Sequence, residues 1–175
     1  MLFTGLGDDG TTYFFGSKER FGKDGPLTEA LGTLDELNSL LGFVKNRAKK
    51  DKKIIDEIQQ NLFIIQAELA GADMRISEMK VKKMEVKINS IEKMLVPIKT
   101  FFVSGANEVS ALFDFARTVA RRAERRVVAL TLSTSSGQAS KPSQFTLAYL
   151  NRLSSLLYAL ARLRAGKVEK KPTYR

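Results

Sequence analysis

Three arginines in the second half of the chain have the spacing of one helical face. Arg117, Arg121 and Arg125 stand at positions i, i+4 and i+8, which form one stripe along an α-helix. Like charges four residues apart repel each other by about 0.2–0.5 kcal/mol per pair, so the stripe indicates a compensating anion. The planar arginine fork suits phosphate oxygens. A solvated charged face is the alternative interpretation.

The amino terminus carries a second feature that suits phosphate. Residues 5–10 match the pattern G-x-G-x-x-G. A dinucleotide-binding fingerprint needs a strand before this pattern and a helix after it, whereas only four residues precede it here. What remains is a glycine-rich loop whose backbone N–H groups can approach an anion closely. Asp8 and Asp9 are candidate ligands for magnesium, and a plain surface turn is the alternative.

The composition restricts the chemistry that this chain can perform. The 175 residues include no Cys, no His and no Trp. Disulfides, Cys/His zinc sites, Ser-His-Asp triads and cysteine nucleophiles are therefore excluded. Catalysis must then rest on positioning, on charge stabilisation and on a nucleophile that belongs to the substrate. The net charge of +10 favours an anionic partner: nucleic acid, anionic lipid or a polyphosphate.

Five stretches with helical periodicity are expected to position these residues. Their apolar residues alternate at spacings of three and four, which is typical of near-parallel helix bundles. The stretches cover approximately residues 27–47, 53–72, 79–98, 108–132 and 143–164. The sequence therefore predicts an all-α, five-helix bundle.

The rest of the chain is predicted to be loop and tail within a single domain. Residues 1–26 form the glycine-rich loop, residues 27–165 the bundle and residues 166–175 a loose basic tail. Connections between helices are expected to be short, except for the polar segment 133–141. No apolar run approaches the ~20 residues of a membrane span, and we expect no secretory signal before the loop. We expect a cytoplasmic protein without a membrane partner.

Two helices carry a second, polar face. Gly32 and Gly42 lie inside the first helix, where each costs about 1 kcal/mol relative to Ala, and Asp35 on the same face could pair with an arginine. The last helix is expected to turn four polar side chains away from its leucine seam: Asn151, Ser154, Tyr158 and Arg162. These faces suggest subunits that pack around a shared site, although an exposed polar face is the alternative.

Four segments together resemble the PduO-type ATP:cob(I)alamin adenosyltransferases. They are residues 4–12, 29–39, 116–128 and 149–154, in the order of that family. The resemblance implies a ferritin-like up-down bundle that assembles as a homotrimer with active sites between subunits. It also implies transfer of the 5′-deoxyadenosyl group of MgATP to the cobalt of a reduced corrinoid, cob(I)alamin, which forms adenosylcobalamin and releases triphosphate. Cobalt(I) is itself the nucleophile, so this reaction needs no His or Cys.

The resemblance assigns roles to individual residues. Arg121 would contact the phosphates and stabilise the leaving group, and Arg117 would pair with Asp35 across the subunit interface. Phe101 would displace the lower axial ligand of the cobalt. Nucleotide contacts are expected from the amino-terminal segment and from two helices: Thr4, Gly5, Leu6, Gly7, Asp8, Gly10, Thr11, Thr12, Lys23, Arg122, Glu124, Arg125 and Asn151.

The chain departs from the family pattern at two positions. Gly5 stands where the family loop usually has Lys, and Ser104 stands where Pro usually precedes Gly105. Three other functions fit parts of the sequence: a basic helical nucleic-acid binder, a carrier of corrinoid or nucleotide without turnover, and a different ATP-dependent transferase. The adenosyltransferase interpretation predicts no nucleic-acid partner and admits a reductase that supplies electrons to the cobalt.

Overall fold

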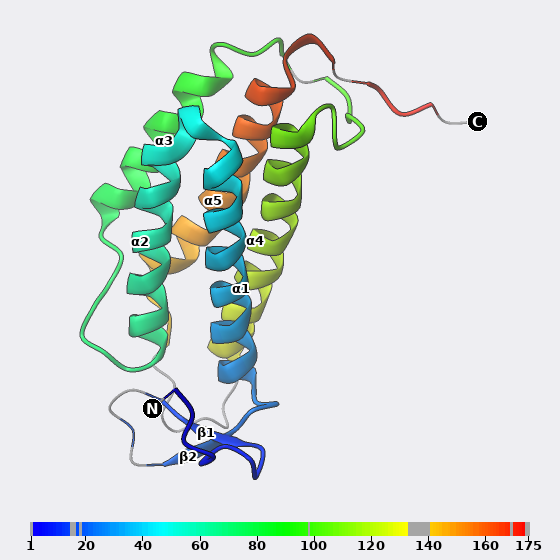
Figure 1. The fold of residues 1–175 in the computed structure, drawn as a ribbon. Coiled ribbons are helices and arrows are strands. Elements are labelled where there is room, and N and C mark those ends of the chain that lie inside the picture. The colour runs from blue at the N-terminus through cyan, green and yellow to red at the C-terminus, as the bar shows by residue number, and fades with distance from the viewer. Residues whose placement is uncertain are drawn as a thin grey trace.

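Five α-helices lie side by side and form the body of the described chain (Figure 1). Successive helices run in opposite directions, and α4 packs along both α1 and α5. The five are α1 Pro26–Arg47, α2 Lys52–Leu69, α3 Glu78–Glu92, α4 Glu108–Leu132 and α5 Gln144–Ala165. The computed structural model describes residues 2–14, 17, 19–97, 99–132, 141–168 and 170–173. The predicted five-helix bundle is confirmed.

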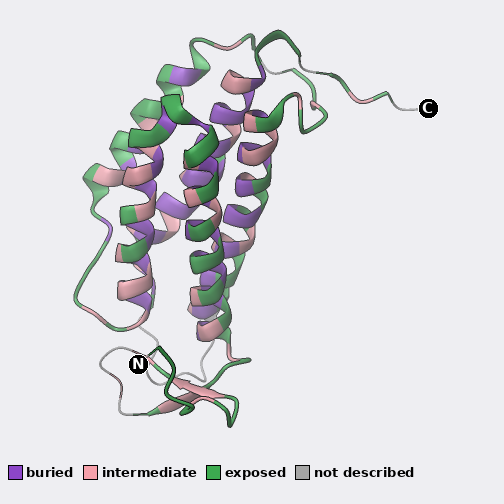
Figure 2. Cartoon of the chain, viewed as in Figure 1, coloured by how far each residue is buried: buried purple, intermediate pink, exposed green. Residues whose placement is uncertain are grey.

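The apolar stripes of the sequence form the core between the helices (Figure 2). Leu34 and Leu41 of α1, Leu62 of α2 and Leu153 of α5 are fully buried. Burial of each such side chain contributes about 1.5–3 kcal/mol, which fixes the helix faces. None of the helices in the described ranges combines the length and the apolar character that a bilayer crossing needs.

The amino-terminal segment contains a short hairpin that the all-α prediction missed. Strands β1 Thr11–Tyr13 and β2 Arg20–Gly22 pair antiparallel, with Thr12 opposite Phe21. Two threonines and a tyrosine are good strand formers, which explains why this part of the predicted loop becomes extended. The hairpin lies at the end of the bundle where α1 begins and α4 ends (Figure 1).

The third helix is shorter than predicted. It ends at Glu92 instead of continuing to residue 98, which itself falls outside the described residues. Pro97 accounts for the difference, because the residue before a proline is displaced from helical geometry and proline donates no backbone hydrogen bond. The connection 93–107 is consequently long, contrary to the expectation of short connections. Most of the predicted polar loop, residues 133–140, also lies outside the described residues.

The predicted loose tail has one backbone anchor. The Val103 amide donates a 2.8 Å hydrogen bond to the carbonyl of Lys170, and Asn107 donates from its side chain to the Arg164 carbonyl. Residues Gly166–Val168 form a 3₁₀ turn after α5. These contacts hold the connection 93–107 against the end of α5.

A buried carboxylate fixes the start of α5. Glu68 of α2 is fully buried and accepts a 2.6 Å hydrogen bond from the Ser143 amide and a second one from the Thr146 hydroxyl. Ser143 is itself the N-cap of α5, since its hydroxyl accepts from the Thr146 amide. The end of α2 and the start of α5 are therefore tied together.

Replacing Glu68 with alanine is expected to lower the free energy of unfolding by about 1–3 kcal/mol, because the buried Thr146 hydroxyl and the partly buried Ser143 amide lose their acceptor. Glu57→Ala is the matched control on α2, since Glu57 forms an exposed ion pair with Lys83. Urea unfolding followed by circular dichroism measures both. Equal stability losses in the two variants would rule out the capping role of Glu68.

Candidate active site

A cavity of about 750 Å³ opens between α3, α4, α5 and the connection that precedes α4. It brings together Phe101, Arg117 and Arg121, three residues that the sequence analysis singled out. Phe101 is 77% exposed at this cavity, whereas its neighbour Phe102 is half-buried. The Phe101 ring is thus available to contact a ligand.

A buried ion pair lies beside this cavity. Arg162 donates a 2.7 Å hydrogen bond to Asp114 Oδ2, and both side chains are almost completely buried. Arg117 Nε lies 3.9 Å from the other carboxylate oxygen, Oδ1. Asp114 therefore faces two arginines and helps to set the direction of Arg117.

The location of Arg162 corrects the expected polar face of α5. Arg162 and Ser154 are buried, whereas both were expected to point away from the leucine seam. The partner of Arg162 explains the difference, since Asp114 lies on another helix and 48 residues earlier in the chain. Sequence reasoning missed Asp114. Its one local signal is its position three residues before Arg117, next to the core residue Phe113.

Aromatic rings complete the surroundings of the two arginines. The guanidinium carbon of Arg117 lies 5.9 Å from the centre of the Tyr158 ring, and that of Arg162 lies 5.2 Å from the same ring. Arg162 also lies 5.7 Å from the Phe102 ring. Cation–π attraction at these distances holds the arginines in place and links them to the segment that carries Phe101.

The remaining arginines of α4 divide into two groups. Arg122 and Arg126 form ion pairs with Glu36 and Glu29 of α1. Arg122 is therefore neutralised on the α1 side and does not reach the cavity. Within the described ranges, no carboxylate lies within ion-pair distance of Arg121 or Arg125. These two exposed cations are the ones left to meet a bound anion.

Two further predicted nucleotide contacts meet at the junction of α4 and α5. Asn151 donates a 2.8 Å hydrogen bond to Glu124 Oε1, and its own oxygen accepts one from Arg152. Glu124 follows Arg121 by three residues, so the pair lies one helical turn from that arginine. Arg121, Glu124 and Asn151 therefore lie along one side of the bundle.

The glycine-rich loop is held together by two cations. Lys23 donates from Nζ to the Gly7 carbonyl, and Arg20 donates to the Leu6 carbonyl, the Thr11 hydroxyl and Asp9. Sequence reasoning did not select Arg20, which comes close to the loop because strand β2 pairs with strand β1. These bonds give the predicted loop residues a defined shape.

Glycine is required at several loop positions. Gly5 and Gly10 have φ values of 70° and 80°, in the left-handed region. At Gly7 a Cβ atom would lie 2.8 Å from Lys23 Nζ and 3.1 Å from the Thr11 carbonyl oxygen. The loop could therefore not close in this form around a larger side chain at position 7.

Asp9 provides a pH test of the loop. Hydrogen bonds from the Thr11 side chain and backbone, with a smaller contribution from Arg20, lower the pKa of Asp9 to about 2. An unfolded aspartate titrates near ~3.9, so the loop gains stability that is complete above that pH and disappears as the pH falls through about 2. We expect the NMR shift of the Thr11 amide to stay constant down to about pH 4 and to change below it. A Thr11 titration centred near the ordinary aspartate value would contradict these contacts.

The loop and Arg121 do not meet within one chain. The loop lies with the hairpin at the end of the bundle, whereas Arg121 lies about 16 Å along the helix axis from the end of α4. Asp35 and Arg117 are likewise apart, since Asp35 is exposed in a cleft between α1 and α2 whereas Arg117 lines the α3–α5 side. The structure thus places the predicted site residues on different surfaces of the chain.

Comparisons with known proteins agree with these features. A family model described as cobalamin adenosyltransferase matches residues 2–164. The chain is 37% identical over 170 residues to the corrinoid adenosyltransferase PduO of Citrobacter freundii, covering 92% of this chain and 49% of that protein. It is 34% identical over 172 residues to the corrinoid adenosyltransferase of Bacillus subtilis, covering 93% and 85%.

A solved structure has the same fold over the whole chain. It is a variant of the PduO-type ATP:corrinoid adenosyltransferase from Lactobacillus reuteri complexed with cobalamin and ATP. The TM-score is 0.87 at 28% sequence identity, with coverage of 100% of this chain and 97% of that chain. The chain spans about half the length of the two PduO relatives from Citrobacter freundii and Salmonella typhimurium.

Proposed function

Because the chain belongs to the cobalamin adenosyltransferase family, we propose that it transfers the 5′-deoxyadenosyl group of MgATP to the cobalt of a reduced corrinoid. The cobalt(I) electron pair attacks the ribose C5′ and forms the Co–C bond. The C5′–O bond breaks, and triphosphate leaves with its electron pair. The observation that carries the proposal is that exposed Phe101 and Arg121, which has no carboxylate partner among the described residues, line one cavity.

Charge stabilisation is the main task of the protein in this reaction. Negative charge builds on the departing triphosphate, and preorganised cations lower the energy of that state. Arg121 on α4 and Lys23 on the loop provide these cations. Since Gly5 has a left-handed backbone conformation, a lysine would be strained there, and Lys23 supplies the loop charge in this chain.

Magnesium is held mainly by the triphosphate. Asp9 Oδ1 already accepts hydrogen bonds from Thr11 and Arg20, which leaves Asp8 as the loop carboxylate for the ion. The described residues include no group of three or more acidic side chains that would hold a metal alone. One carboxylate together with substrate phosphates is a common magnesium environment, so the loop fits the ion.

The corrinoid occupies the cavity at Phe101. The exposed ring approaches the lower face of the corrin and displaces the axial ligand, which leaves cobalt(II) four-coordinate and easier to reduce. Ser104, which replaces the usual proline, lines the same cavity. A partner reductase supplies the electron that produces cobalt(I).

A homotrimer brings the predicted site residues together. The loop of one subunit reaches Arg121 of the next, and Asp35 pairs with Arg117 across the same interface. Exposed aromatic side chains on the bundle surface support such an assembly: Phe43, Phe63 and Phe115 are each more than half exposed in the single chain. Light scattering after size exclusion is expected to give about three times the mass of the chain.

An anaerobic spectral assay tests the proposed reaction. Chemically reduced cobalamin and MgATP are expected to yield adenosylcobalamin and triphosphate in equal amounts. A carrier without turnover would bind both compounds and release no triphosphate. A nucleic-acid binder would bind neither and would instead show affinity for duplex with a steep salt dependence. Either of these results would overturn the proposal.

A further inference from the structure

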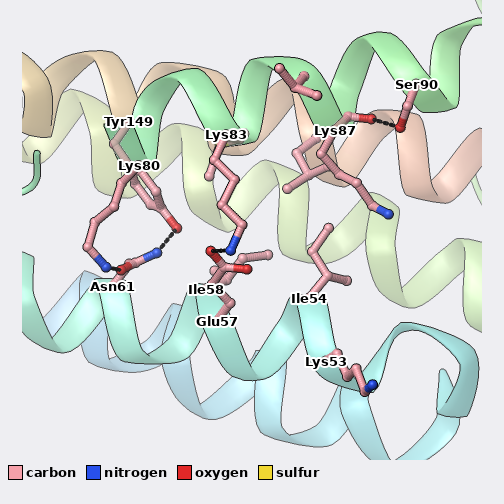
Figure 3. Close-up of a pocket in the computed structure, with 13 residues that line it drawn as sticks. Lys53, Ile54, Glu57, Ile58, Asn61, Lys80, Lys83, Lys87, Ser90 and Tyr149 are labelled. Atoms are coloured by element: carbon pink, nitrogen blue, oxygen red, sulfur yellow. Dashed lines mark hydrogen bonds and ion pairs between the residues drawn. The ribbon is translucent and has the colours of Figure 1, made fainter. Parts of the chain in front are cut away.

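A second cavity, of about 350 Å³, lies in the groove between α2 and α3 (Figure 3). Helix α2 packs on α1 and α3 packs on α5, so the two helices are held apart above the surface of α5. The cavity shares no lining residue with the one at Phe101. Its volume lies within the range of about 300–1,000 Å³ that is typical of small-molecule sites.

The inner end of this cavity is polar and buried. Tyr149 and Asn61 are 1% and 2% exposed, and Asn61 donates a 3.0 Å hydrogen bond to the tyrosine oxygen. Lys80 donates to the Asn61 oxygen (Figure 3). Burial raises the pKa of the Tyr149 hydroxyl, so this group keeps its proton. Within the described ranges that proton has no acceptor, and Lys80 uses one of its three N–H groups on Asn61.

The remainder of the cavity is apolar below and cationic around the rim. Ile58, Met84 and Leu156 are buried along its floor. The rim carries three lysines and a single acid: Lys53, Lys83, Lys87 and Glu57. Lys83 pairs with Glu57 at 2.7 Å. The rim thus keeps a net positive charge, which favours an anionic ligand with an apolar body.

We propose that the α2–α3 cavity binds a small organic carboxylate with an unbranched apolar chain. Its oxygens accept hydrogen bonds from the Tyr149 hydroxyl and the Lys80 ammonium group, and its chain lies on Ile58, Met84 and Leu156. A carboxylate fits better than inorganic phosphate, because phosphate would leave the apolar floor uncovered. The site is separate from the proposed nucleotide and corrinoid sites.

Titration of the whole protein with sodium octanoate tests this assignment. Calorimetry is expected to give saturable binding of one octanoate per chain, and NMR shifts are expected at Asn61, Lys80 and Tyr149. Octan-1-ol, which keeps the chain but lacks the charge, and inorganic phosphate, which keeps a charge but lacks the chain, are expected to bind at least about 10-fold more weakly. Comparable affinity of octanol, or shifts centred at Phe101, would overturn the proposal.

Two lysines on the same helix give a matched pair of variants. Lys80→Gln is expected to weaken octanoate binding about 10-fold or more, because a charge-assisted hydrogen bond is lost. Lys82→Gln is expected to leave binding unchanged, since Lys82 pairs with Glu78 outside the cavity. Val86→Trp, at an exposed position on the rim, should block entry while the bundle stays folded. Equal effects in the two lysine variants, or full binding by Val86→Trp, would also overturn the proposal.

Discussion

Replacement of Arg121 by alanine is expected to lower kcat by roughly 10²–10³ while the bundle stays folded. Arg121 is exposed, lines the cavity at Phe101 and has no carboxylate partner within the described ranges. Its replacement is therefore expected to leave the free energy of unfolding unchanged. Negative charge on the triphosphate increases as the C5′–O bond breaks, so Arg121 is expected to stabilise the transition state more than bound MgATP, and kcat is expected to fall more than binding. Initial rates with saturating MgATP and reduced cobalamin measure the effect.

Arg126→Ala is the matched control for this variant. Arg126 lies on the same helix and is similarly exposed, but it pairs with Glu29 of α1. Its loss is expected to change the rate less than about 3-fold, as for a surface ion pair that contributes ~0–1 kcal/mol. Near-normal turnover of Arg121→Ala, or an equal loss in both variants, would remove Arg121 from the reaction.

Replacement of Asp114 by alanine is expected to lower the free energy of unfolding by about 3–5 kcal/mol. The variant removes one partner of an ion pair in which both side chains are almost fully buried, and loss of one partner of a buried ion pair is strongly destabilising. Denaturant unfolding at neutral pH provides the measurement.

Glu108→Ala controls for the loss of an acid from the same helix. Glu108 forms an exposed ion pair with Arg47, so a change of only ~0–1 kcal/mol is expected. The double variant Asp114→Leu with Arg162→Met should recover much of the stability, because an apolar pair replaces the buried ion pair. A loss below about 1 kcal/mol in Asp114→Ala would contradict the importance of the buried pair.

The sequence predicted those features that depend on local periodicity. The bounds of α4 agree with the prediction because its apolar and arginine stripes are both regular along 25 residues. The end of α3 was misplaced because the apolar spacing continues past Glu92, whereas the backbone restriction from Pro97 ends the helix earlier. The hairpin was missed because each strand has only three residues, too few for a period to be recognised.

Sequence reasoning selected three residues that the structure brings to one cavity: two through their spacing on one helix, and Phe101 through the family resemblance. Arg117 and Arg121 share α4, and their spacing alone indicated an anion. The pairing of Asp114 with Arg162 was not predictable, because it joins two helices through residues that lie 48 positions apart in the chain. Arg20 was missed for a similar reason, since hairpin register brings it to Asp9 and Thr11.

The decisive question is whether the loop of one subunit completes the arginine site of another. Two inactive variants, Gly7→Val and Arg121→Ala, can be unfolded together and reassembled at equal concentrations. Gly7→Val is expected to distort the loop, since a side chain at this position would collide with Lys23 and the Thr11 carbonyl. Each interface then draws its loop and its arginine from different chains.

Random assembly makes about one interface in four with both parts intact, because each part is intact in half of the chains and trimer interfaces are head-to-tail. The mixture is therefore expected to regain about a quarter of the wild-type adenosyltransferase rate, whereas each variant refolded alone stays nearly inactive. A mixture that is no more active than its two components would contradict a site shared between subunits.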